Sequence, residues 1–358
     1  MNRYIFRYSF NFSFITNFIK SLITFNRFPD FHIFTSRLKI LGLLCLISIN
    51  IAQFPKICNA NIYFVDSNGG GTGVQCTGLA NIPYDGSGIG EKCKVNHLTW
   101  LHQVEGGTTK LRNGDVVNVA SGSYEFGINA PNRPASTSVC APLYPYGCKL
   151  KPLPDGVSII GDADNPPEFW GAERVEHIIS LFGSDNIVIK NLSITDHSEC
   201  IEHKDCNRTT IPYGPWAING IVAQDSTNVL LENVSIHGLK RGIRAGRLKD
   251  WTLKNVVLRG NTLVGWDGDI GLSSSNSGYM DFINSKIEYN GCAEGYPDTS
   301  KIFNCYGQSQ SGYGDGLGTQ KTNGEWYFEN TEISHNVSDG LDLLYAGSSG
   351  TVTIVGGR

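Results

Sequence analysis

A short pattern of alternating apolar and polar residues recurs along the C-terminal half of the chain. Each copy has an apolar strand, an asparagine, a second apolar pair and a polar turn with glycine. The copies read NIVIKNLSI (186–194), NVLLENVSI (228–236), WTLKNVVL (251–258), MDFINSKI (280–287) and WYFENTEI (326–333). Alternation with a period of two is typical of β-strands that bury one face. We therefore predict an all-β fold built from this repeat.

Six glycines set the length of the repeat. Successive members of the series are separated by 22, 26, 23, 25 and 24 residues, and a polar residue precedes each one. The series consists of Gly220, Gly242, Gly268, Gly291, Gly316 and Gly340. Short strands at this regular spacing, with no helical segment between them, indicate stacked coils. We predict a solenoid whose coils are about 22–26 residues long.

Residues 37–60 have the features of a secretory signal. Two basic residues precede the apolar run Ile40–Ala52, and a short polar segment with small residues at its end follows. This order predicts cleavage after Ala60. The apolar run has 13 residues, fewer than the roughly 20 of a membrane-spanning helix. We therefore predict an exported protein, extracellular, at the cell surface or periplasmic, with no stable membrane span in the mature chain.

The signal divides the chain into three parts. Residues 1–36 form an N-terminal extension, which indicates either a start site placed too far upstream or a transit-type or membrane-associating segment. Residues 61–358 are expected to form one solenoid domain after the signal at 37–60. The sequence stops just after a strand of the next coil without a polar cap. Because an uncapped end exposes core and strand edge, we expect a truncated reading frame or an end covered by a partner.

Net charge argues against nucleic acid as a partner. Cleavage after Ala60 removes seven of the 29 basic residues and one of the 33 acidic ones, which leaves a net charge of −10. An acidic surface repels phosphate backbones. We expect no nucleic-acid partner.

The eight cysteines that remain after cleavage fall in close sequential pairs. An exported chain favours disulfides between neighbours, whereas a metal site would need CxxC-like spacing, which these pairs lack. Eight cysteines allow 105 connectivities, so the pairing is a prediction from proximity alone. The predicted pairs are Cys76 with Cys93, Cys140 with Cys148, Cys200 with Cys206, and Cys292 with Cys305.

The turns that read NGI, RGI, DGD and DGL, each followed by a strand–Asn–strand segment, resemble the coils of right-handed parallel β-helix proteins of the pectate-lyase-like superfamily. NIYFVDSNGGG (61–71) resembles the opening strand of such secreted proteins, and NGDVVNVASGSY (113–124) resembles their first coil. The resemblance implies a right-handed parallel β-helix with disulfide-closed loops over most of residues 61–358. It also implies a short amphipathic helix within 95–104 that caps the core.

No catalytic residue follows from a family motif. The Asn-Thr-Asp, Asp-Asp, Gly-His-Gly and Arg-Ile-Lys series of polygalacturonases is missing, and so is the Trp-Ile-Asp-His segment of extracellular pectate lyases. Candidate chemistry therefore has to come from the register of the repeat.

Three aspartates precede register glycines and are the candidate catalytic residues: Asp267, Asp315 and Asp339. Equivalent positions of neighbouring coils lie about 4.8 Å apart. The spacing predicts that Asp315 and Asp339 are immediate neighbours and that Asp267 lies two coils away. Like charges at this distance raise one pKa, which gives a proton donor beside a carboxylate, as glycosidic cleavage requires.

The same carboxylates could hold calcium, with Asp269 and Asp342 as further ligands. Calcium would neutralise uronate groups of an acidic polysaccharide, and Arg244 would take the proton in a β-elimination. The structural alternative is that Asp-Gly pairs simply form tight turns.

Two further motifs suggest binding. LKRGIRAGR (239–247) gathers guanidinium groups, including Arg241 and Arg244, that suit a polyanion or form salt bridges. Trp266 lies beside Asp267 and is a candidate surface for a sugar ring. DHSECIEHKDC (196–206) suits either a transition metal or a disulfide-closed polar loop.

Two functions of different classes fit these observations. The first is a polysaccharide lyase or glycoside hydrolase that uses the aspartate turns. The alternative is a non-catalytic cell-surface or adhesive solenoid that binds glycan or protein.

Overall fold

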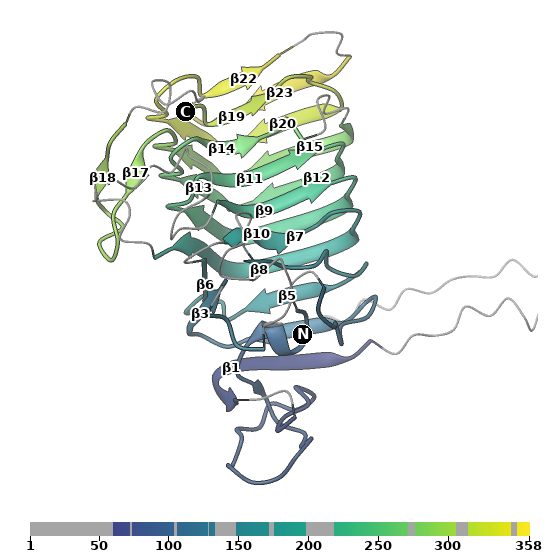
Figure 1. The fold of residues 1–358 in the computed structure, drawn as a ribbon. Helices are drawn as coiled ribbons and strands as arrows, with labels where there is room; N and C mark the ends of the chain where they lie inside the picture. The colour runs from purple at the N-terminus through teal and green to yellow at the C-terminus, as the bar shows by residue number, and fades with distance from the viewer. Residues whose placement is uncertain are drawn as a thin grey trace, which may run out of the picture. The chain divides into compact units, whose positions relative to one another are not determined.

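The strand–Asn–strand segments are parallel β-strands stacked one upon the next in a computed structural model of the chain (Figure 1). The structure describes residues 60–71, 74–103, 106–127, 129–132, 148–171, 175–197, 218–270, 276–305, 314–344 and 349–358. The predicted extension and all but the last residue of the predicted signal lie outside these ranges. Cys58–Arg358 forms one unit.

The larger sheet has fourteen strands. Its main path runs through β1 (Ile62–Gly70), β2 (Val116–Val119), β5 (Ser158–Gly161), β8 (Asp185–Asp196), β10 (Thr227–His237), β12 (Lys249–Lys254), β15 (Ser277–Ile283), β20 (Glu325–Glu329) and β23 (Thr351–Val355). Five shorter strands extend it sideways: β3 (Ser123–Phe126), β6 (Glu168–Gly171), β13 (Val257–Arg259), β16 (Lys286–Glu288) and β21 (Glu332–Ser334).

The second sheet has seven strands, all paired in parallel. It consists of β4 (Cys148–Lys149), β7 (Val175–Ser180), β9 (Asn219–Gln224), β11 (Arg241–Gly246), β14 (Val264–Asp267), β19 (Leu317–Thr319) and β22 (Leu341–Leu343). From β9 onward the chain passes alternately between the two sheets. In each sheet, a strand pairs with the strand that the previous coil contributed to that sheet. This is the arrangement of a β-solenoid, and the prediction of an all-β, parallel-stranded fold is confirmed.

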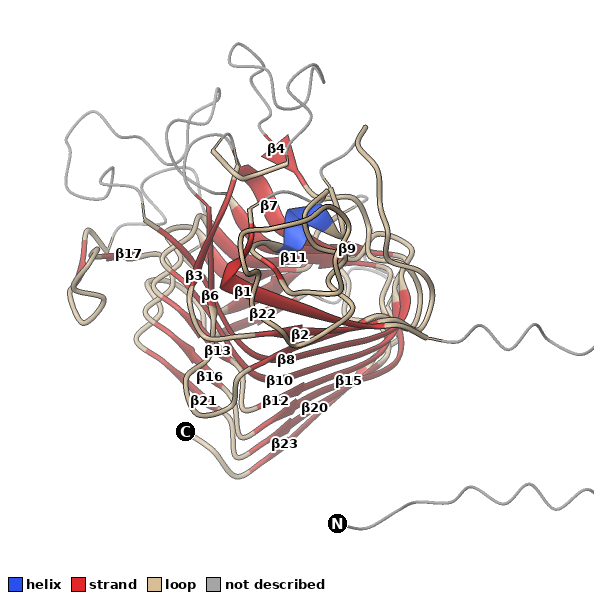
Figure 2. Ribbon diagram, turned by 90° about the horizontal axis from the view of Figure 1, so that it is seen from below, coloured by secondary structure: helices blue, strands red, loops and turns tan. Residues whose placement is uncertain are grey.

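The core between the sheets is built from columns of equivalent residues. Val229, Trp251, Met280 and Trp326 occupy one column of the larger sheet, paired strand to strand. Each of these side chains is at most 2% exposed. Figure 2 shows the successive strands β8, β10, β12, β15, β20 and β23 following one another when the stack is seen from below. Repetition of the apolar positions therefore produces a continuous core along the stack.

The asparagine of each repeat occupies a left-handed bend, within β8 and β10 and between β12 and β13. Asn191, Asn233 and Asn255 have φ of 56°, 56° and 54°, a region that asparagine tolerates better than most residues. The amide of Asn233 donates to Oδ1 of Asn191 at 2.9 Å, and that of Asn255 donates to Oδ1 of Asn233 at 2.9 Å. The recurring asparagine thus sets the bend and links neighbouring coils.

The predicted helix in 95–104 is a smaller element than expected. The helical element that the structure describes there is a single 3-10 turn, η1 (Leu98–Trp100), and the side chain of His97 accepts from the backbone N–H of Thr99. Leu98 and Leu101 are fully buried, as an amphipathic segment requires. The His102 ring bonds Thr109 and the carbonyl of Lys151, which ties the following residues to neighbouring segments.

Two predicted disulfides are confirmed, Cys76–Cys93 and Cys292–Cys305. Cys148 is disulfide-bonded too, but its predicted partner Cys140 lies outside the described residues. The fourth predicted disulfide joins Cys200 and Cys206. Both Cys200 and Cys206 lie outside the described residues, so this pairing stays a prediction.

Among the residues that the structure describes, no helix has the length and apolar character needed to cross a membrane.

Candidate functional site

The aspartate turns lie at the C-terminal end of the seven-stranded sheet. Asp315 and Asp339 are immediate neighbours, as predicted, since the backbone N–H of Asp339 donates to Oδ1 of Asp315 at 3.1 Å. The carbonyl of Asp339 in turn accepts from the N–H of Gly316 at 2.8 Å. The turn and the strand that follows it are therefore held rigidly from one coil to the next.

The predicted position of Asp267 is wrong in two respects. Asp267 pairs with Gly318 of β19, so it lies one coil from that strand rather than two. Asp267 also lies three residues beyond the position of its own coil that is equivalent to Asp315. The reason is that the glycine that stacks in this coil is Gly265. A Cβ on Gly265 would lie 2.6 Å from the carbonyl oxygen of Gly316. Gly265 follows an apolar residue, so the rule of a polar residue before glycine selected Gly268 instead.

Asn290, the polar residue before the register glycine Gly291, does not lie in the column of Asp315 and Asp339. It belongs to a buried amide ladder, in which Oδ1 of Asn290 accepts from Asn261 and its own amide donates to Asn336, each at 3.0 Å. An antiparallel hairpin of β17 (Ala293–Glu294) and β18 (Ile302–Phe303) interrupts the solenoid after this point. The inserted residues lengthen the chain between Gly268 and Gly316. The glycine spacing therefore predicted one coil too many in this part of the chain.

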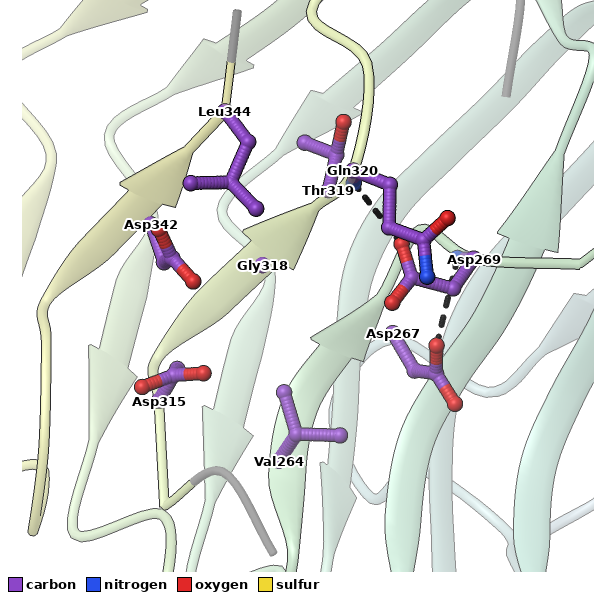
Figure 3. Close-up of a pocket in the computed structure, with 9 residues that line it drawn as sticks. All are labelled: Val264, Asp267, Asp269, Asp315, Gly318, Thr319, Gln320, Asp342 and Leu344. Atoms are coloured by element: carbon purple, nitrogen blue, oxygen red, sulfur yellow. Dashed lines mark hydrogen bonds between the residues drawn. The ribbon is translucent and has the colours of Figure 1, made fainter. Parts of the chain in front are cut away.

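A pocket lies on the outer face of the seven-stranded sheet, at the coils whose register is corrected above. Four aspartates line it, together with Val264, Gly318, Thr319, Gln320 and Leu344. Figure 3 shows Asp267 and Asp269 on one side, Asp315 and Asp342 on the other, and Gly318 between them. Because Asp267, Gly318 and Asp342 occupy one column across three strands, the missing side chain of Gly318 leaves the space between the two carboxylates open.

Burial and mutual repulsion favour protons on three of these carboxyls. Burial raises the pKa of Asp315, and the charges of Asp342 and Asp339 raise it further. Burial likewise raises the pKa of Asp269, with added repulsion from Asp267 and Asp342. The pKa of Asp342 is raised by burial and by the charge of Asp339. The pocket is thus a set of weak acids with closely coupled protons.

Asp267 forms ion pairs with two arginines of the neighbouring coil. Nε of Arg241 lies 2.6 Å from Oδ2 of Asp267, and Nε of Arg244 lies 3.5 Å from the same oxygen. The Arg241 side chain is 16% exposed and that of Arg244 is 43% exposed. Burial together with these two guanidiniums lowers the pKa of Lys240 to about 8. The salt-bridge interpretation of Arg241 therefore holds, while Arg244 keeps a guanidinium at the surface.

The prediction that Trp266 binds substrate is wrong. Its indole is fully buried and makes edge contacts with Trp251, Phe282 and Trp326 at centroid distances of 5.8, 5.6 and 6.3 Å. In β14 the side chains alternate between the two faces of the sheet, so Asp267 points outward and Trp266 points inward. The ring packs in the core and cannot stack on a ligand.

The described residues do not form the predicted calcium site. Within the ranges given above, no three His, Cys, Asp or Glu side chains are grouped so that they could hold a metal ion. Asp269 and Asp342 line the same pocket but on opposite sides of Gly318 (Figure 3). Arg241 also occupies one oxygen of Asp267, which makes this carboxylate a poorer calcium ligand.

Asp339 has a supporting position. It is exposed and does not line the pocket, but its backbone holds Asp315 and its charge acts on Asp315 and Asp342. Sequence reasoning missed Gln320, whose backbone N–H donates to Oδ1 of Asp269 at 2.8 Å. A correct register would have placed Gln320 beside Asp269, since it follows the strand that pairs with Asp267.

Most of the polar segment 196–206 lies outside the described residues. Of its candidate ligands, His197 is described, and its Nε2 lies 3.0 Å from a carboxylate oxygen of Glu168. The ring is stacked between Trp170 and Tyr296 at centroid distances of 4.2 and 4.0 Å. His197 therefore contacts neighbouring coils and the inserted hairpin.

No known family model matches the chain, and comparison with curated proteins and with solved structures gave no match either.

Proposed function

We propose that the protein is an exported enzyme that hydrolyses glycosidic bonds of a uronate-containing polysaccharide at the pocket of Asp267, Asp269, Asp315 and Asp342. The fold we propose is a right-handed parallel β-helix of the pectate-lyase-like type. The repeat and the parallel strands support this fold. The disulfides support an oxidising compartment. The coupled aspartates around Gly318 are the observation that carries the proposed activity.

Asp342 serves as the general acid in this proposal. Burial and the charge of Asp339 raise its pKa, so it holds a proton more readily than an ordinary aspartate. It is only half-buried, so a substrate oxygen can approach it. The side chains of Asp315 and Asp269 line the same pocket, where their oxygens can face the positive charge that develops on the sugar ring in an oxocarbenium-like transition state.

Asp267 serves as the base. Its carboxylate, which lies 2.6 Å from Nε of Arg241, can accept a proton from an attacking water molecule. The backbones of Asp267 and Asp342 are separated by two strand spacings, roughly 9.5 Å. This wide spacing favours the arrangement of inverting glycosidases, whose acid and base carboxyl groups lie roughly 6.5–9.5 Å apart and leave room for water, over the closer pair of retaining enzymes. We therefore expect inversion at the anomeric carbon.

Arg244 supports the choice of an acidic polysaccharide. Its guanidinium is 43% exposed at the edge of the aspartate cluster, where it can form a bidentate contact with a uronate carboxylate. Without such a cation, the four aspartates would repel an acidic sugar chain. Hydrolysis is proposed because the pocket combines a carboxylate paired with Arg241 and a carboxyl of raised pKa, a base and an acid of the kind that glycosidic hydrolysis uses.

The proposal is tested by measuring new reducing ends from a panel of polysaccharides, with and without chelator. Wild type is compared with Asp342→Asn and Asp267→Asn. Asp281→Asn is the matched control, because burial also raises the pKa of Asp281, which belongs to β15 of the other sheet. Cleavage that survives chelation and is lost only in the pocket variants supports hydrolysis here. No cleavage by folded wild type would favour a non-catalytic glycan- or protein-binding solenoid.

A further inference from the structure

A second group of polar side chains lies on the outer face of the larger sheet, away from the aspartate pocket. Ser193 belongs to β8, and His237 ends β10, the next strand of the sheet. Glu294 comes from β17 of the inserted hairpin, which stands at one side of the stacked strands (Figure 1). Three segments far apart in the sequence thus bring a hydroxyl, an imidazole and a carboxylate together.

The three side chains form a continuous hydrogen-bonded chain. Oγ of Ser193 lies 3.0 Å from Nε2 of His237, and Nδ1 of His237 lies 2.5 Å from Oε1 of Glu294. With a proton on Nδ1, the imidazole donates to Glu294 and leaves Nε2 free to accept from the serine. Thr195 also places its hydroxyl 3.3 Å from Nδ1, on the side of the ring that faces the carboxylate.

Glu294 is held in place from several directions. It is 1% exposed, and its second oxygen lies 2.7 Å from Nη1 of Arg259. A buried carboxylate requires such partners to offset the loss of hydration. Gly260 allows its close approach, since a Cβ there would lie 2.9 Å from Cβ of Glu294, and its φ of 58° also favours glycine. The solenoid is thus shaped to accept the hairpin acid behind His237.

We propose that Ser193, His237 and Glu294 are a nucleophilic triad that hydrolyses carboxylic esters of small acyl groups. The order of contacts is that of serine hydrolases, in which a base activates the nucleophile and a third group orients the base. Ser193 and His237 are catalytic residues here, and Glu294 positions the imidazole. This activity does not depend on the aspartate pocket or on its proposed function.

The reaction balances with water as the only co-reactant. Oγ of Ser193 attacks the ester carbonyl carbon while its proton passes to Nε2 of His237. The tetrahedral adduct then releases the alcohol, which takes that proton, and leaves an acyl-serine. A water molecule gives a proton to His237 and attacks the acyl carbon. The carboxylic acid departs, and the proton returns to Oγ of Ser193.

The surroundings of Ser193 favour a small acyl group. Ser193 is half-buried, so only its outer side is open to a substrate. It pairs with Glu168 in the neighbouring strand β6, and Glu168 binds Ser123 and His197. The stacked rings of Trp170, His197 and Tyr296 lie beside this carboxylate. A half-buried serine beside this carboxylate and these rings favours an acetyl-sized acyl group, and an acidic acyl group would be repelled by Glu168.

The experiment combines a fluorophosphonate probe with hydrolysis of p-nitrophenyl acetate by the purified protein. Variants are Ser193→Ala, His237→Ala and Glu294→Gln. Ser235→Ala is the matched control, because Ser235 is the half-buried residue paired with Ser193 in the adjacent strand. Mass spectrometry of the labelled peptide identifies the serine that reacts. Thermal melting of each variant establishes that it is folded.

We expect the probe to label Ser193 in wild type and in Ser235→Ala. Ser193→Ala and His237→Ala should lower kcat by about 100-fold or more. Glu294→Gln should lower the labelling rate and kcat with little change in KM, which a purely structural role would not produce. Absence of labelling in folded wild type would overturn the proposal. Ester hydrolysis that persists in Ser193→Ala would overturn it as well.

Discussion

Asp267 and Asp342 occupy equivalent positions two strands apart on the seven-stranded sheet, with Gly318 between them. Both residues line the same pocket, on opposite sides of a position that has no side chain. A repeat that stacks identical positions would normally place side chains in continuous contact. The glycine interrupts the column and opens a space in which two acids can act on one substrate.

The aspartate pocket should be a source of instability at neutral pH. Burial raises the pKa of Asp315, so the folded state binds its proton more tightly than the unfolded state. The associated stability is fully present below the usual aspartate value of 3.8 and is lost as the pH rises through the folded pKa. Asp315→Asn should raise Tm at pH 7 and leave it almost unchanged at pH 3, as scanning calorimetry can show. A lower Tm at pH 7 would contradict the repulsion inferred here.

Acid should destabilise the N-terminal coils through two buried histidines. Burial lowers the pKa of His97 and of His102 to about 4. Because the unfolded chain binds these protons first, stability falls as the pH drops from 6.5 to about 4. At 1.36 kcal/mol per pKa unit, each histidine contributes about 3 kcal/mol to this loss.

The variant His97→Asn separates this effect from general acid unfolding. The introduced amide oxygen can still accept from the N–H of Thr99, which the ring nitrogen of His97 binds in wild type. The variant loses ring contacts and should be less stable overall. Its unfolding free energy should nevertheless fall less steeply between pH 6.5 and about 4 than that of wild type. An unchanged slope would show that His97 does not carry the pH dependence.

Substitution of Trp266 should affect folding and leave ligand binding almost unchanged. Trp266→Ala removes a fully buried indole from contact with Trp251 and Phe282, and large aromatic truncations in a core cost about 3–5 kcal/mol. Trp266→Phe should cost less and remain folded. Denaturant unfolding measures the cost, and KM of the Phe variant should equal that of wild type. A large rise in KM would restore a binding role.

The asparagine ladder should contribute to stability through both its bend and its amide bonds. Asn233→Ala loses two amide contacts and places alanine at φ 56°, so we expect a cost of about 2 kcal/mol. Asn233→Gly removes the same contacts without the backbone penalty and should cost about 1 kcal/mol less. Urea unfolding of the two variants separates these contributions. Equal costs would mean that the left-handed bend is not the reason for asparagine.

The repeat predicted the strands of the larger sheet because each copy carries its own apolar alternation. It also predicted that Asp315 and Asp339 are neighbours, since no insertion separates their coils. It failed at Asp267, where an apolar residue precedes the stacking glycine, and at Trp266, whose face of the strand depended on that register. The proposed triad of Ser193, His237 and Glu294 could not be predicted. Glu294 belongs to an inserted hairpin, whose position does not follow from the spacing of the repeat.

The most direct test of the proposed hydrolase is the anomeric configuration of the first product released from a uronate-containing polysaccharide, followed by proton NMR. The proposal predicts a product of inverted configuration, formed with chelator present. It also predicts that Asp342→Asn and Asp267→Asn, but not Asp281→Asn, lower its rate by about 100-fold or more. A product with a double bond, retained configuration, or full activity in both pocket variants would contradict it.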